Sequence, residues 1–154
     1  MKRLIFYILK ILSFLCRPLS IKSSQKLLIF AHKTIGVVFK GKPDYIETDA
    51  YLDASGGLTI MNDVVISTKV IILTHDWSFL KRNGGDKINP EKYNSMAFQP
   101  VIIGESSFIG AGAIILPGSI IGRHCIIGAG TVIKGKIDDN SIAIGNPCKI
   151  LSKT

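Results

Sequence analysis

Residues 103–138 decide the fold, because they divide into six blocks of six residues: IGESSF, IGAGAI, ILPGSI, IGRHCI, IGAGTV and IKGKID. Isoleucine opens every block, and the fifth residue is small in five of the six, with Ile137 as the exception. Such a strict period marks a repeat architecture. We interpret each block as a short strand followed by a tight turn, with its first and fifth residues pointing inward.

Three blocks make one triangular coil, and successive coils stack as parallel strands about 4.8 Å apart. The sequence contains a check of this stacking, since the run Gly-Ala-Gly at 110–112 recurs 18 residues later at 128–130. The second residue of a block is often glycine, which we interpret as freedom for a tight backbone at that position. The pattern predicts an all-β fold, a parallel β-helix of hexapeptide repeats.

A weaker version of the period begins at residue 60 with IMNDVV, ISTKVI and ILTHDW, and residues 46–57 are expected to supply another partial coil. The period fails after Trp77 and returns after Gln99, which predicts a loop inserted into a coil over residues 78–99. A loop of that length in a compact repeat is usually functional or disordered. Its start three residues after a histidine, in the block ILTHDW, favours function.

The apolar run at residues 4–16, LIFYILKILSFLC, predicts an amino-terminal helix of about 20 Å, short of the roughly 30 Å of a bilayer core. Arg3, Lys10 and Arg17 recur every seven residues and therefore share one face of that helix. Two alternatives stay open for residues 1–17: contact with a membrane interface, or packing on protein. A cleaved signal peptide is less favoured, because a lysine interrupts the run and no A-x-A-like cleavage site follows.

A second short helix is expected over residues 23–33, with Ser23 or Ser24 as its cap, after Pro18 ends the first. These elements form a helical segment, residues 1–40, ahead of the β-helix domain.

The β-helix domain is assigned residues 41–154, and the whole chain carries a net charge of +8 with 47% hydrophobic residues. The high apolar content excludes a disordered protein. A nucleic-acid partner is not expected, because the basic residues are scattered and no aromatic-basic alternation occurs. An anionic membrane surface and the phosphates of a nucleotide-like cofactor suit the charge better. The three cysteines have no zinc-site spacing, so no metal is expected.

The chain has three histidines, and His75 is the candidate for catalysis. It is the fourth residue of ILTHDW, so it projects outward, and the long loop leaves the stack beside it. A lone exposed base beside a groove suits direct group transfer without a covalent enzyme intermediate. His124 also points outward but has no carboxylate motif beside it. His32, in the second helix, is expected to be an ordinary surface or interface residue.

From about residue 45 to residue 151 the chain resembles the acetyl-coenzyme A-dependent O-acetyltransferases of the hexapeptide-repeat family. This group includes maltose and galactoside acetyltransferases and enzymes that acetylate bacterial surface polysaccharides. The motifs that carry the resemblance are ILTHD at 72–76, PVIIG at 100–104, PG at 117–118 and IGNP at 144–147. The resemblance implies a left-handed β-helix and a homotrimer with a site at each of its three subunit interfaces.

The resemblance also implies roles for single residues. His75 matches the catalytic base, and Asp53 an acceptor-binding carboxylate, with Asp76 of the same THD motif as a further substrate-binding candidate. Phe108 stands where relatives often have tryptophan beside the thioester. The other residues expected to bind the coenzyme line its groove or face its phosphates; they are Ala111, Ala129, Lys134 and Lys149.

The expected activity is acetyl transfer from acetyl-coenzyme A to a hydroxyl of a saccharide, such as a surface polysaccharide or its precursor. Two alternatives stay open: an N-acyltransferase of an amino sugar, and a non-catalytic trimeric β-helix scaffold. The expected location is the cytoplasm, with peripheral contact on the inner face of the membrane as a further option.

Overall fold

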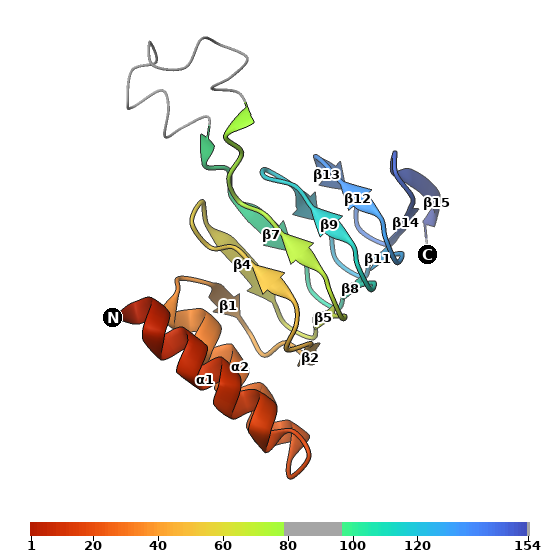
Figure 1. The fold of residues 1–154 in the computed structure, drawn as a ribbon. Coiled ribbons are helices and arrows are strands. Elements are labelled where there is room, and N and C mark those ends of the chain that lie inside the picture. Colours follow the sequence, from red (N-terminus) through yellow and green to blue (C-terminus); the bar gives the residue numbers. More distant parts are fainter. Residues whose placement is uncertain (79–96, 154) are drawn as a thin grey trace, which may run out of the picture.

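A computed structural model describes residues 1–78 and 97–153 of the chain. It is a triangular β-solenoid of about four turns, with three sheets of parallel strands, preceded by two helices (Figure 1). The predicted parallel β-helix of hexapeptide repeats is therefore confirmed. The helices are α1 (Lys2–Cys16) and α2 (Ile21–Thr34).

Within each of the three sheets the strands stack from the amino-terminal end of the solenoid to its carboxy-terminal end. The first sheet contains β1 (Val38–Lys40), β4 (Leu58–Met61), β7 (Val101–Ile103), β10 (Ile120–Ile121) and β13 (Lys136–Ile137). The second contains β2 (Tyr45–Ile46), β5 (Val65–Ile66), β8 (Phe108–Ile109), β11 (Ile126–Ile127), β14 (Ser141–Ile144) and β15 (Lys149–Lys153). The third contains β3 (Tyr51–Leu52), β6 (Ile71–Ile72), β9 (Ile114–Ile115) and β12 (Val132–Ile133).

The core is built from the residues that open the blocks. Ile103 pairs with Ile121 and Ile109 with Ile127, so the register repeats every coil as the sequence indicated. All four side chains are buried in the core. The last coil is shorter: Ile121 pairs with Ile137, which takes the place of a block-opening residue. The exception at the fifth position is thus explained, because the coil closes two residues early.

The glycines at the second block position have a different role from the expected one. A Cβ on Gly104 would lie 2.3 Å from the carbonyl oxygen of Gly122 in the next coil. The left-handed backbone falls instead at the fourth position, as in Ser106 with φ +54° and Gly112 with φ +67°. Second-position glycines therefore permit the close approach of coils, and the fourth residue makes the turn.

The two helices lie side by side against the first coil, at the opposite end of the molecule from β15 (Figure 1). The side-chain amide of Gln25 donates to the carbonyl oxygen of Ile46 at 2.9 Å and accepts from its N–H at 3.0 Å, which satisfies the open edge of β2. Ser20, rather than Ser23 or Ser24, caps α2 by accepting from the N–H of Ser23. Within the described residues, neither helix has the length and apolarity needed to cross a membrane.

The sequence left His32 as a surface or an interface residue, and the structure shows that it lies at the interface of the two helices. It is buried between the helices, and its Nδ1–H donates to the carbonyl oxygen of Leu28 at 2.9 Å. Burial lowers the pKa of His32 to about 4, since the low-dielectric surroundings disfavour the charged ring. His32 therefore belongs to the packing of the helical hairpin.

Candidate active site

The candidate site lies at the corner where the chain passes from the third sheet to the first, which we call the His75 corner. Its turns follow β3, β6, β9 and β12, and residues 53, 73, 116 and 134 begin them. After β6 the chain departs from the coil: His75 pairs with Phe98 in an antiparallel bridge, and the N–H of Asp76 donates to Ala97 at 2.8 Å. Residues 79–96 of the expected loop lie outside the described residues.

A carboxylate from the first coil holds the imidazole of His75. The Oδ2 atom of Asp53 lies 2.6 Å from Nδ1 of His75. The same oxygen accepts from the N–H and the hydroxyl of Thr74, at 2.9 and 2.8 Å, and Oδ1 accepts from the N–H of Ser55 at 2.9 Å. A carboxylate can only accept, so Nδ1 carries the proton and Nε2 is left with the lone pair of a base.

The electrostatics keep Asp53 charged. Burial alone would raise the pKa of Asp53, but hydrogen bonds from Ser55 and Thr74 outweigh it and hold this pKa well below its usual range. Asp53 is 8% exposed, whereas the His75 side chain is 30% exposed. The pair thus has a buried anion behind a ring that can reach a reactant.

Aromatic rings flank the imidazole. The centroid of the His75 ring lies 6.1 Å from that of Trp77 and 6.2 Å from that of Phe98, and these two rings lie 6.0 Å apart. Trp77 is about half exposed. Ser55 adds a hydroxyl 3.1 Å from Nδ1 of His75. The corner therefore combines a base, a hydroxyl and apolar ring faces.

Two further predicted residues lie at this corner. Asp76 is exposed, and its pKa is lowered, first by a hydrogen bond from the N–H of Ser78 and further by the charge of Lys134. Lys134 follows β12, two coils along from His75. Within residues 1–78 and 97–153, no group of three or more His, Cys, Asp or Glu side chains is arranged to hold a metal ion.

Comparisons with known proteins agree with this architecture. The family model for the bacterial transferase hexapeptide (six repeats) matches residues 100–135. In Escherichia coli, the "Putative lipopolysaccharide biosynthesis O-acetyl transferase WbbJ" is 29% identical over 121 residues, which cover 77% of this chain and 61% of that protein. In Staphylococcus aureus, the "Putative acetyltransferase SAV2555" is 35% identical over 115 residues, which cover 73% of this chain and 53% of that protein.

The chain belongs to the hexapeptide-repeat acetyltransferase family. It spans between half and two thirds of the length of these curated relatives. A solved structure with the same fold is galactoside acetyltransferase in complex with coenzyme A, with a TM-score of 0.66 and 19% identity, covering 99% of this chain and 80% of that one.

The remaining residues that the resemblance to this family singled out lie elsewhere. Phe108 is in β8, and Ala111 and Ala129 are in the turns that follow β8 and β11, so all three lie across the third sheet from His75. Lys149 begins β15 on the second sheet. All except the half-buried Ala111 are exposed. Within one chain, the structure therefore separates these four residues from the His75 corner.

The sequence pointed to His75 but missed several of its neighbours. Thr74 lies inside the ILTHD motif, but its hydrogen bonds go to Asp53, which lies in the previous coil. Ser55 falls in residues 53–57, where the period is too irregular to assign a direction to a side chain. Phe98 is brought back to His75 across an insertion, and no local signal announces such a pairing.

Proposed function

We propose that the chain transfers an acetyl group from acetyl-coenzyme A to a hydroxyl of a saccharide, with His75 as the general base. The observation that carries the proposal is the 2.6 Å contact between a buried, charged Asp53 and the partly exposed ring of His75. Such a pair fixes the ring and its tautomer, so that the lone pair of Nε2 can take a proton from the acceptor.

The reaction is a direct transfer. The acceptor hydroxyl gives its proton to Nε2 of His75 as its oxygen bonds to the thioester carbonyl carbon. The tetrahedral intermediate then collapses, the C–S bond breaks, and the proton passes to the departing sulfur to give coenzyme A and the acetyl ester. A backbone N–H or another fixed dipole is expected to stabilise the oxyanion.

Asp53 has an orienting role in this scheme rather than the acceptor-binding role that the resemblance implied. Its oxygens already accept from His75, Thr74 and Ser55, which leaves little capacity for an acceptor hydroxyl. Asp76 is exposed beside the base and is the better candidate for acceptor contact. The faces of Trp77 and Phe98 suit the apolar face of a sugar ring.

The working unit is a homotrimer in which the site forms between two copies. Two observations support this. The residues proposed for acetyl-coenzyme A, Phe108, Ala111, Ala129 and Lys149, lie away from His75 in one chain, so a second copy has to bring them to it; Lys134 is at the His75 corner itself. The outer face of the third sheet between the two groups is also apolar, formed by Tyr51, Ile71, Ile114 and Val132.

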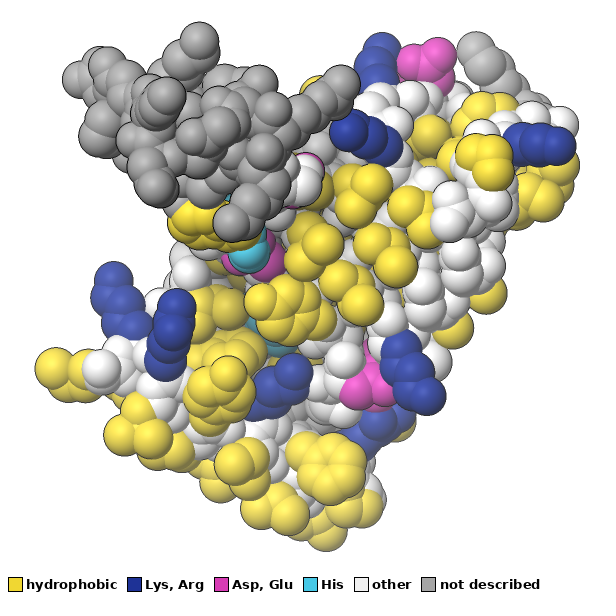
Figure 2. Space-filling view, turned by 45° about the horizontal axis from the view of Figure 1, so that its top comes forward, with side chains coloured by type: hydrophobic (Ala, Val, Ile, Leu, Met, Phe, Trp, Pro, Cys, Tyr) yellow, Lys and Arg dark blue, Asp and Glu magenta, His cyan; other side chains and the backbone are white. Residues whose placement is uncertain are grey.

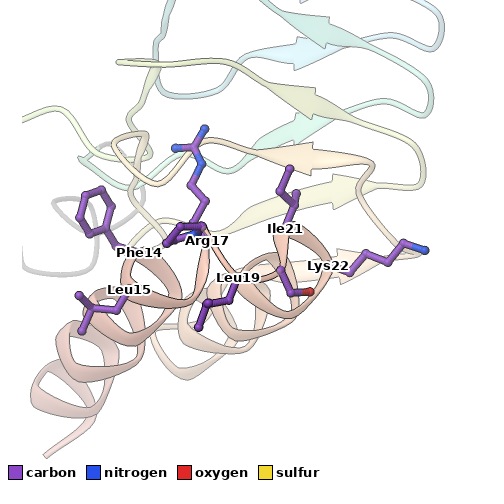
Figure 3. Close-up of a pocket in the computed structure, with 8 residues that line it drawn as sticks. Phe14, Leu15, Arg17, Leu19, Ile21 and Lys22 are labelled. Carbon is purple, nitrogen blue, oxygen red and sulfur yellow. The ribbon is translucent and has the colours of Figure 1, made fainter.

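Residues 1–17 contact the inner face of a membrane peripherally. Residues 1–34 hold seven of the 19 Lys and Arg residues and none of the 11 Asp and Glu residues. Leu15 and Leu19 are 60% and 88% exposed and point away from the coils, whereas Arg17 extends toward them (Figure 3). The exposed leucines and the excess of basic residues over residues 1–34 suit anionic lipid, although Arg17 itself pairs with Glu47. Cosedimentation with anionic but not neutral vesicles is expected; equal recovery with both would contradict the contact.

Replacement of the base tests the central proposal. His75→Ala should lower transfer to a saccharide hydroxyl by about a hundredfold or more, with acetyl-coenzyme A binding intact. His124→Ala is the matched control, because His124 has the same block position at another corner, and it should leave transfer unchanged. Unchanged transfer in His75→Ala would refute the role. Transfer only to amines, or no binding of acetyl-coenzyme A, would instead support the N-acyltransferase or the scaffold alternative.

A further inference from the structure

A hollow of about 400 Å³ lies between α1 and the first coil and reaches the His75 corner. Figure 2 shows the cyan and magenta side chains of histidine and carboxylates within a hollow of the surface, with Lys and Arg side chains on the helical side of it. The residues that matter among its lining are Arg3, Phe6, Tyr7 and Lys10 from α1, and Tyr51 and Ser55 from the coil. Ser55 links this hollow to the candidate base, since its hydroxyl lies 3.1 Å from Nδ1 of His75.

The cations of this hollow lack the carboxylate partner that a neighbouring cation has. Arg17, on the same helical stripe, donates to both carboxylate oxygens of Glu47. Arg3 and Lys10 form no ion pair within residues 1–78 and 97–153. Among the described residues, the ammonium of Lys10 has a long contact with the carbonyl oxygen of Ala50, at 3.4 Å, and lies 5.8 Å from the centre of the Phe6 ring.

Burial makes this arrangement unfavourable for a cation by itself. It lowers the pKa of Lys10, and the charge of Asp49 offsets only part of that effect. An anion in the hollow would restore a partner to Lys10, and Arg3 can add bidentate hydrogen bonds to phosphate oxygens. Asp53 also lines the hollow and is charged, so Arg3, Lys10 and Asp53 together give it a net charge of about +1, which still favours an anion such as a phosphate.

We propose that the acceptor is a phosphorylated saccharide whose phosphate binds Arg3 and Lys10 in this hollow while its sugar extends past Ser55 to His75. The inference rests on the proposed acetyl transfer and names the class of acceptor. The rings of Tyr7 and Tyr51 flank the path and provide surfaces for the sugar. The phosphate can belong to a soluble sugar phosphate or to a lipid-linked one, since α1 also exposes Leu4, Ile8 and Ile11.

Direct binding tests the anion site without depending on the reaction. Calorimetric titration of the full chain would use inorganic pyrophosphate, then hexose 1-phosphates against the matching methyl hexosides. The wild type should bind pyrophosphate and prefer each phosphate over its neutral counterpart by about tenfold or more. The double variant Arg3→Gln/Lys10→Gln should lose both effects. The double variant Lys22→Gln/Lys26→Gln, which removes the same two charges from exposed positions outside the hollow, should retain them.

Several outcomes would overturn the inference: no binding of pyrophosphate, equal binding of charged and neutral sugars, or a preference that survives the double variant. His75→Ala should lose transfer but keep the preference for phosphate, so a failure of the anion site and a failure of the catalytic role give different results. A decyl phosphodiester of the same hexose in vesicles separates the two sources, because tighter binding than the free sugar phosphate assigns the lipid-linked form.

Discussion

The His75 corner and the other two corners of the solenoid follow the same repeat but differ in the second residue of the block. At the other corners this residue is often glycine, as in Gly104 and Gly110, because the next coil lies too close for a Cβ. At the His75 corner the corresponding residues are Asp53, Leu73, Leu116 and Lys134. The difference teaches that the second block position has room for a side chain at the His75 corner. A site can be built where side chains have this room.

The fourth residue of the block differs as well. His124 takes φ +54° and closes its turn, as do Asp63, Lys69 and Asn140 at the same position. His75 is not among the residues with positive φ, because the chain leaves the coil there and pairs with Phe98. The candidate base is therefore available where the repeat is broken, and a histidine at an unbroken corner serves only a turn.

The largest expected effect concerns the close packing of the ordinary corners. Gly104→Ala should lower the free energy of unfolding by about 3 kcal/mol, because its Cβ would meet the backbone of Gly122, which cannot move aside. Gly112→Ala is the control: no atom lies within 4 Å of its Cβ, and only the left-handed φ should cost about 1 kcal/mol. Urea unfolding measures both, and equal losses would remove the proposed distinction between second and fourth positions.

A smaller effect is expected from the carboxylate that orients the base. Asp53→Asn should lower transfer by about tenfold to a hundredfold, because the ring loses its fixed tautomer. Asp49→Asn is matched, since Asp49 bridges the same two coils through the hydroxyl of Thr68 and the N–H of Lys69. It should cost about 1 kcal/mol of stability and no transfer. Equal loss of transfer in both variants would indicate a structural role for Asp53.

The charge of Asp53 also predicts that the wild type and Asp53→Asn differ in how their stability changes at low pH. The pKa of Asp53 is depressed in the folded chain, so its charge stabilises the fold above the unfolded value near 3.8, and this stabilisation is lost as the pH falls below it. The midpoint of thermal unfolding should therefore fall more steeply below about pH 4 in the wild type than in Asp53→Asn.

The smallest expected effect on stability concerns the left-handed turn residue His124, because His75 does not have a positive φ. His124→Gly should raise the free energy of unfolding by up to about 1 kcal/mol, because glycine relieves the left-handed strain while adding freedom to the unfolded chain. His75→Gly should give no such gain. A gain in both variants, measured by thermal unfolding, would mean that the His75 corner is strained like the others.

The sequence predicted the coils well because their physics is local and repeated. The aliphatic residue that opens each block, such as Ile109 or Ile115, needs only its own spacing to be recognised as core. The His75 corner was harder, since the bonds of Asp53 to Thr74 and the pairing with Phe98 join distant residues. The burial of His32 could not be predicted, because the sequence of two amphipathic helices does not reveal which polar residue their contact buries.

The closed ends of the solenoid limit how the molecule can associate. Gln25 occupies the peptide edge of Ile46 at one end, and β15 runs antiparallel to β14 at the other. A stack of parallel strands with bare ends would grow head to tail into fibres. Because both ends are covered within the second sheet, this sheet offers no bare strand edge to a second copy, and the proposed trimer would have to form through the flat outer faces.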